Sequence, residues 1–344
     1  MMDHERDEDL NAELRDAIAR LPRSVEPPED LWPGIRDQIR AGGLRRGRPA
    51  VLVRWMPLAL AAVLILAVAW WLVGGERGTS EIWEVERVAG APRVGDATLD
   101  AMGSLQVGQW IETDDSSRAV ITVGDIGHVD VRPGSRVRLV RARSTDHRLA
   151  LAYGSIHAKV TAPPRIFFVE TPAGLATDLG CEYTLETDSS GRGLIHVTGG
   201  YVEFAARNRR SIVPLAAFAV TRPDEGPGMP YAEDAPESLR RALIAFDFEQ
   251  GGTGAARAAL AAARSEDALS IWHLLGRVDP ALRGEVYDRL ATLVPPPAGV
   301  TRERALALHA GSLERYWDTI RRINFRRVIL RGLRDMDART GVAK

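Results

Sequence analysis

The sequence is very poor in cysteine, and Cys181 is the only one in its 344 residues. A lone cysteine excludes an intramolecular disulfide and any zinc site built from several thiolates. The chain also lacks a charge excess of either sign, since 45 lysines and arginines stand against 46 aspartates and glutamates. This balance gives no electrostatic reason to expect a nucleic acid as a partner.

The motifs that commonly carry enzyme chemistry are missing as well. The seven histidines are scattered without a His-Glu-x-x-His motif, and the chain has no Gly-x-Ser-x-Gly elbow and no phosphate-binding loop with its lysine. The stretch from Gly251 to Gly254 lacks a preceding strand and a third fingerprint glycine, so we interpret it as an interhelical turn. We therefore predict that the chain is not an enzyme and holds no cofactor or metal, with an envelope enzyme as the least favoured alternative.

An apolar run is present from Trp55 to Val73, and it contains no charged residue. As a helix it would be about 28 Å long, close to the hydrocarbon thickness of a bilayer. Trp55 at one end and Trp70 and Trp71 at the other occupy the positions of interfacial aromatic anchors. The run predicts a transmembrane helix over residues 51–74. A buried core helix is disfavoured because the run has no polar stripe.

The flanks of this run predict its direction. The preceding stretch is basic and acid-free, with Arg40, Arg45, Arg46, Arg48 and Arg54, whereas Glu76, Glu81, Glu84 and Glu86 dominate the following one. The positive-inside rule then places the N-terminus in the cytoplasm and the larger C-terminal part outside. We expect a single-pass protein of the cytoplasmic (inner) membrane, with periplasmic or extracytoplasmic C-terminal domains and the lipid bilayer as one partner.

Residues 1–50 form a predicted cytoplasmic arm with two short amphipathic helices, which Pro22 and Pro27-Pro28 separate. One interpretation is a partly disordered juxtamembrane segment, because two short helices bury little surface alone. The other is that their apolar faces fold onto a cytoplasmic partner. The candidate partner-binding residues are Leu10, Leu14, Ile18, Leu31, Trp32, Ile35 and Ile39.

Residues 81–222 change from helical spacing to a period of two, as in Ile121 with Val123 and Val129 with Val131. Such alternation predicts short strands with one buried face, and their number without intervening helices predicts an all-β sandwich or roll. Turn signals punctuate the strands. The glycines among them are Gly108, Gly134, Gly154, Gly174, Gly180 and Gly200, which we interpret as conformational requirements of the fold rather than a binding site.

The helical pattern returns after residues 223–232, a stretch rich in proline and glycine that we predict to be a linker. Asp234 with Pro236 and Asp279 with Pro280 are typical of helix N-termini. Ala268, Ile271 and Leu275 form an apolar stripe at helical spacing. Residues 233–344 therefore predict a small α-helical bundle.

The order of pieces in the β-rich part resembles the FecR domain. The resemblance rests on LQVGQWIETDDSSRAVITVGDIGHVDVRPGSRVRL (105–139), FFVETPAGLATDLGCEYTL (167–185) and HVTGGYVEF (196–204). One departure is Gly180-Cys181, where the family usually has Gly-Thr before an aromatic residue. The arm is similar to those of membrane-bound anti-sigma factors through Leu31 to Ile35, without the histidine and cysteine ligands of the zinc-containing kind.

The resemblance implies a transmembrane regulator that relays an envelope signal to a cytoplasmic ECF (extracytoplasmic-function) sigma factor through protein–protein interaction. The outside partner would then be an unknown periplasmic protein, such as the signalling domain of an outer-membrane transporter. The alternative is an envelope scaffold or binding module with no sigma-factor role. The predicted fold class is a multidomain membrane protein: a short helical cytoplasmic arm, one transmembrane helix, an all-β FecR-like domain and a C-terminal α-helical bundle.

Overall fold

The structure, a computed structural model, describes residues 82–207 and 209–340. The chain divides into two compact units, Met1–Gly75 and Glu76–Lys344, and all described residues belong to the second. The predicted arm and its candidate partner-binding residues lie outside the described residues. So does the predicted span 51–74 with its anchors Trp55, Trp70 and Trp71.

The predicted fold class, a membrane protein, is corrected by what the structure describes: a mostly β-sheet part followed by helices. Within residues 82–207 and 209–340, no helix is long and apolar enough to cross a membrane. The longest of these, α9 (Ala310–Thr340), is too rich in arginine. The prediction of the class rested on the run 55–73, which none of the described helices contains.

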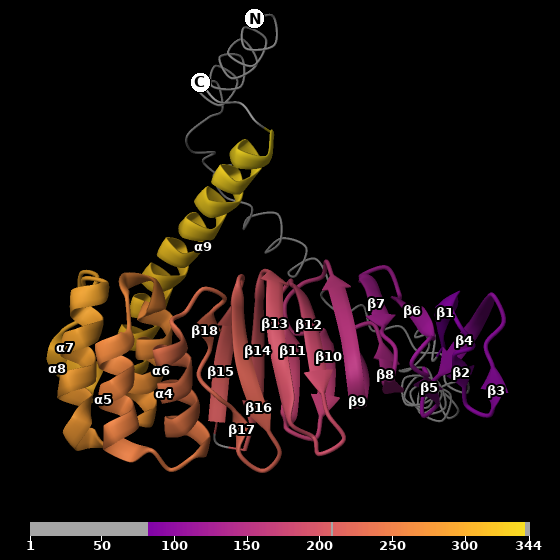
Figure 1. Cartoon of the computed structure of the whole chain (residues 1–344), viewed down its shortest axis with the longest axis horizontal. Coiled ribbons are helices and arrows are strands. Elements are labelled where there is room, and N and C mark those ends of the chain that lie inside the picture. Colours follow the sequence, from indigo (N-terminus) through magenta and orange to yellow (C-terminus); the bar gives the residue numbers. More distant parts are fainter. Residues whose placement is uncertain (1–81, 208, 341–344) are drawn as a thin grey trace, which may run out of the picture. The chain divides into compact units, whose positions relative to one another are not determined.

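The strands form two sheets that share one long strand, β9 (Asp146–Val160) (Figure 1). In the order of pairing, the first sheet consists of β4 (Met102–Gln106), β1 (Ile82–Ala89), β6 (Arg118–Val123), β7 (Gly127–Val131), β9, β12 (Glu182–Thr187), β13 (Gly193–Gly199) and β16 (Ala217–Arg222), with β17 (Gly226–Pro227) and β18 (Tyr231–Ala232) paired to β16. The second consists of β3 (Ala97–Thr98), β2 (Arg93–Val94), β5 (Trp110–Glu112), β8 (Arg136–Arg143), β9, β10 (Phe167–Thr171), β11 (Gly174–Asp178), β14 (Tyr201–Ala206) and β15 (Arg209–Pro214). The pairing of β9 with β10 is parallel, and the other pairings between these strands are antiparallel.

Strand β9 belongs to both sheets because its buried face changes halfway. Leu149 and Leu151 are buried in its first half, and Ile156 and Ala158 in its second, so the alternation shifts phase between them. Gly154 lies at the shift with φ 96°. The sequence pattern suggested a turn at Gly154, whereas the structure keeps one strand that passes from one sheet to the other.

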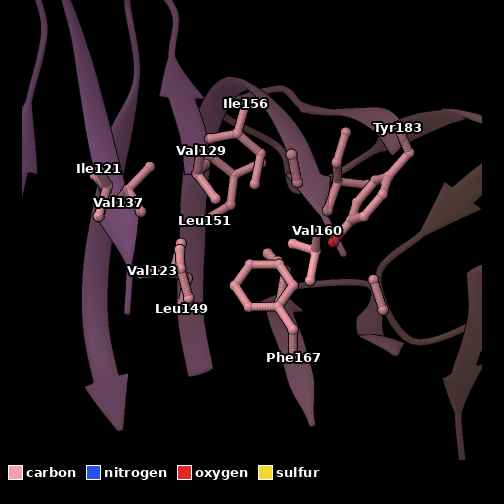
Figure 2. Close-up of a cluster of buried hydrophobic side chains, with 14 of the residues drawn as sticks. Ile121, Val123, Val129, Val137, Leu149, Leu151, Ile156, Val160, Phe167 and Tyr183 are labelled. Carbon is pink, nitrogen blue, oxygen red and sulfur yellow. The ribbon is translucent and has the colours of Figure 1, made fainter. Parts of the chain in front are cut away.

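The inward faces of the two sheets enclose a hydrophobic core. Figure 2 shows Ile121, Val129, Val137, Leu149 and Phe167 packed together from strands of both sheets, and each is fully buried. Burying a side chain of this size stabilises the fold by about 1.5–3 kcal/mol. The period-two alternation of the sequence thus has its physical cause in this shared core.

The helical part has a core of its own. Its helices are α4 (Glu237–Phe248), α5 (Gly252–Ala262), α6 (Ala268–Arg277), α7 (Arg283–Leu293), α8 (Arg302–Leu306) and α9, with single 3-10 turns at Ser265–Asp267 and Pro280–Leu282. Ile271, Leu275, Leu290 and Tyr316 are fully buried between them. The Tyr316 hydroxyl donates a hydrogen bond of 2.6 Å to the carbonyl of Val294. Helices α4 to α7 each bury apolar side chains on one face, as amphipathic helices of a bundle do.

A buried ion pair connects the helices to the strands. The Arg277 guanidinium on α6 lies 2.5 Å from the Asp247 carboxylate on α4. Asp247 also accepts a 2.6 Å hydrogen bond from the Met229 backbone N–H, and Arg277 donates to Ser211 Oγ on β15 at 2.7 Å. Met229 lies in the segment predicted as a linker, and that segment also forms β17 and β18. It is therefore an ordered part of the junction between strands and helices.

Candidate interaction surface

The outward face of the first sheet bears a row of residues paired across its strands. Asp130 on β7 is opposite His157 on β9, His157 is opposite Thr184 on β12, and Thr184 is opposite His196 on β13. Phe218 on β16 continues the row, and its ring stacks on His196 with centroids 4.2 Å apart. Alternation places these side chains outward because their neighbours along each strand fill the core. We call this row, with the charged residues beside it, the sheet face.

Charged residues accompany the histidines of the sheet face. Glu182 lies 3.3 Å from His157 Nε2 and 3.6 Å from the Lys159 ammonium, and Glu233 pairs with His196. These side chains are only partly buried, and exposed ion pairs contribute about 0–1 kcal/mol each. They therefore add little to stability, and their main physical effect is to give the surface a defined pattern of charge.

One part of the sheet face has the connectivity of a catalytic triad. Thr184 Oγ1 lies 3.1 Å from His157 Nδ1, and Glu182 lies at the other ring nitrogen. Acyl transfer also needs N–H donors aimed at a developing oxyanion. Here β12 pairs with β9 on one side and β13 on the other, so the ladders occupy the backbone amides around Thr184. The geometry suits a surface hydrogen-bond network, and a flat face of this kind can recognise a protein partner by polar contacts.

A second polar group lies inside the sandwich, at the end of β11. The Asp178 carboxylate accepts a 2.6 Å hydrogen bond from the Gly180 N–H and another from the Cys181 thiol. Burial raises the pKa of Asp178 to about 6. Burial, together with the nearby Asp178 carboxylate, also raises the pKa of the Cys181 thiol. Since the thiolate is the reactive form, Cys181 is an inert buried side chain at neutral pH.

The glycines predicted as turn residues have left-handed backbone. Their φ values are 93° for Gly108, 65° for Gly134, 96° for Gly154, 145° for Gly174, 85° for Gly180 and 67° for Gly200. A Cβ at Gly200 would also lie 1.9 Å from the Gly180 carbonyl oxygen, which is far inside van der Waals contact. All six positions therefore favour glycine for its backbone conformation, and Gly200 also requires it for the close approach of two backbone segments.

The structure brings together residues that the sequence did not assign to a site, above all Thr184, Glu182 and Glu233. Alternation along β9 and β13 places His157 and His196 outward, but the row depends on the pairing of strands far apart in sequence. Among the residues that the structure describes, no group of three or more His, Cys, Asp or Glu could hold a metal ion. The predicted partner-binding residues of the arm stay a prediction.

Comparison with known proteins identifies the β-rich part. Residues 109–203 match the family model described as FecR protein, which confirms the predicted resemblance over this stretch. The match comprises strands β5 to β13, the first residues of β14, and with them the greater part of the sheet face. It supports a regulatory role.

Solved structures with similarity include two of a proposed anti-sigma factor from Parabacteroides distasonis, at 1.65 and 2.50 Å resolution. Each has 17% sequence identity and a TM-score of 0.33, over 39% of this chain. The chain covers 64% and 63% of the two structures, which is less than two thirds of their length. No curated protein matches the chain.

Proposed function

We propose that this chain is a FecR-type regulator that controls an ECF sigma factor by protein–protein interaction, in response to a signal from the envelope. The observation that carries the proposal is the FecR match over residues 109–203. The described β-strands supply a rigid scaffold for that match, because both sheets pack on one continuous core. A rigid sheet can present a fixed pattern of charge to a protein partner.

The sheet face is the surface that we assign to the envelope partner. It combines the stacked pair His196 and Phe218 with the carboxylates of Glu182 and Glu233. Aromatic residues within a polar surround are typical of protein interfaces. The face bears both signs of charge, so the partner that fits it is a protein surface of mixed charge rather than a nucleic acid.

The sigma factor is assigned to the arm, whose apolar residues are the predicted contacts. Affinity purification of the full-length tagged chain from its host should recover an ECF sigma factor, identified by mass spectrometry. The double variant Leu31→Ala/Trp32→Ala should reduce recovery by about tenfold or more, because two large apolar anchors commonly contribute several kcal/mol to a protein interface. The control Arg36→Ala changes a polar residue of the same segment and should leave recovery unchanged.

Failure to recover any sigma factor with the native chain would refute the regulator proposal. Recovery of envelope proteins alone would instead support the alternative function, a scaffold or binding module that uses the FecR domain only for contact.

A further inference from the structure

One end of the sandwich contains a cavity of about 570 Å³. It lies where β1 begins, between the β6–β7 turn at Gly124 to Ile126 and the β8–β9 turn before His147. This volume is within the range of sites that hold small molecules or single side chains of a partner, about 300–1,000 Å³. The cavity is separate from the sheet face, since no residue of that row lines it.

Two aromatic rings line the inner part of this cavity. Trp83 and His147 are 3% and 8% exposed, and their ring centroids are 5.8 Å apart. Nδ1 of His147 is buried without a hydrogen-bond partner. Buried polar groups of native proteins are nearly always paired, so this nitrogen lacks a hydrogen-bond partner that a donor group of a ligand could supply. Burial lowers the pKa of His147, so the ring is neutral and one of its nitrogens accepts.

The outer part of the cavity is acidic. Glu84 on β1 and Asp125 in the β6–β7 turn line it, both are exposed, and neither has an ion-pair partner among the described residues. Among the residues that the structure describes, no lysine or arginine lines the cavity. The potential within this cavity is therefore negative and favours a cationic ligand.

We propose that this cavity binds a guanidinium or alkylammonium group on an apolar stem. The cation lies between the carboxylates of Glu84 and Asp125, the stem packs on Trp83, and an N–H of the ligand donates to His147 Nδ1. Aromatic and acidic groups together bind such cations through cation–π attraction and charge-assisted hydrogen bonds. The same chemistry is offered by an arginine or lysine side chain of a partner protein and by a free amine.

The test is calorimetric titration of the full-length chain with Nα-acetyl-arginine-N-methylamide and with the matching citrulline derivative. Citrulline keeps the shape of arginine and replaces the cation by a neutral urea. The arginine probe should bind at least about tenfold more tightly, because its cation gains charge-assisted hydrogen bonds that the neutral urea lacks. Equal binding of the two probes, or binding of neither at millimolar concentration, would overturn the proposal.

Variants then locate the site. Glu84→Gln/Asp125→Asn should weaken the arginine probe by about tenfold or more, whereas Glu86→Gln, on the same strand but outside the cavity, should leave its affinity unchanged. His147→Phe keeps an aromatic ring and removes the acceptor, so it should weaken binding by a smaller factor. An unchanged affinity in the double variant would contradict the assignment, even if the native chain binds arginine.

A further titration, with agmatine, distinguishes a side chain of a partner protein from a free amine as the source of the cation. Agmatine presents the guanidinium and its stem without a peptide backbone. Tighter binding of the capped arginine indicates a side chain of a protein partner, and equal binding indicates a free amine. Either result supports the cation site.

Discussion

The sandwich and its junction with the helices each bury an aspartate, and the two are stabilised differently. Asp247 at the junction has a cationic partner, Arg277, at 2.5 Å. Asp178 in the sandwich has only the Cys181 thiol and backbone amides as donors, and burial raises its pKa to about 6. The comparison teaches that burial alone does not decide the state of a carboxyl group. A paired charge can be kept inside, whereas an unpaired one binds a proton more readily.

The largest expected loss of stability follows from replacing the paired aspartate, Asp247. Asp247→Ala leaves Arg277 without its carboxylate and the Met229 N–H without an acceptor, so we expect a loss of about 3–5 kcal/mol in the free energy of unfolding. Urea denaturation measures it. The control Asp130→Ala removes an exposed pair with Arg118 and should cost about 0–1 kcal/mol. Similar losses in both variants would show that the buried ion pair contributes no more to stability than the exposed one.

The second-largest expected loss of stability comes from a substitution that strains the backbone inside the sandwich. Gly154→Ala places a Cβ 2.3 Å from the Ser135 Cα and forces alanine to adopt φ 96°. We expect a loss of about 2–4 kcal/mol from strain and overpacking. Gly108→Ala is the matched control, because φ is 93° and nothing lies within 4 Å of its Cβ. Its loss should be about 1 kcal/mol. Equal losses would mean that the chain relieves the contact between the new Cβ at residue 154 and Ser135 without a loss of stability.

The smallest effect expected is the pH dependence due to the unpaired aspartate. The folded pKa of Asp178, about 6, exceeds the ordinary value of 3.8, so the folded state binds its proton more tightly. Its contribution to stability is therefore present below about pH 4 and is lost as pH rises to about 6, up to about 3 kcal/mol in total. Asp178→Asn should remove this dependence and be more stable relative to the native chain at pH 7.5 than at pH 4.

His273 acts in the opposite direction, since burial lowers its pKa to about 3 and its contribution is lost as pH falls below about 6.5. The contribution of His273 is the same in both chains, so it cancels in the difference in unfolding free energy between Asp178→Asn and the native chain at each pH. Urea unfolding curves of both chains at several pH values measure this difference. A difference that does not vary with pH would contradict the raised pKa of Asp178.

Much of the β-rich part could be predicted because its signals are local. Alternation such as Ile121 with Val123 marks the inward positions, and glycines such as Gly200 mark the turns. The phase change within β9 could not be read so directly, because Gly154 is both a turn signal and a crossing point between sheets. The predicted fold class, a membrane protein, was wrong. It was based on the apolar run 55–73, which lies outside the described residues. The predicted localisation stays a prediction for the same reason.

The sequence by itself determined which residues face inward, where glycine is required and that the FecR pattern is present. Only the tertiary structure decided which outward residues meet. The row from Asp130 to Phe218, the pair Asp247 with Arg277 and the cavity at Trp83 and His147 each join residues from separate strands or helices. Side-chain alternation follows from the geometry of a single strand. Register between strands and packing between sheets depend on contacts between residues far apart in sequence.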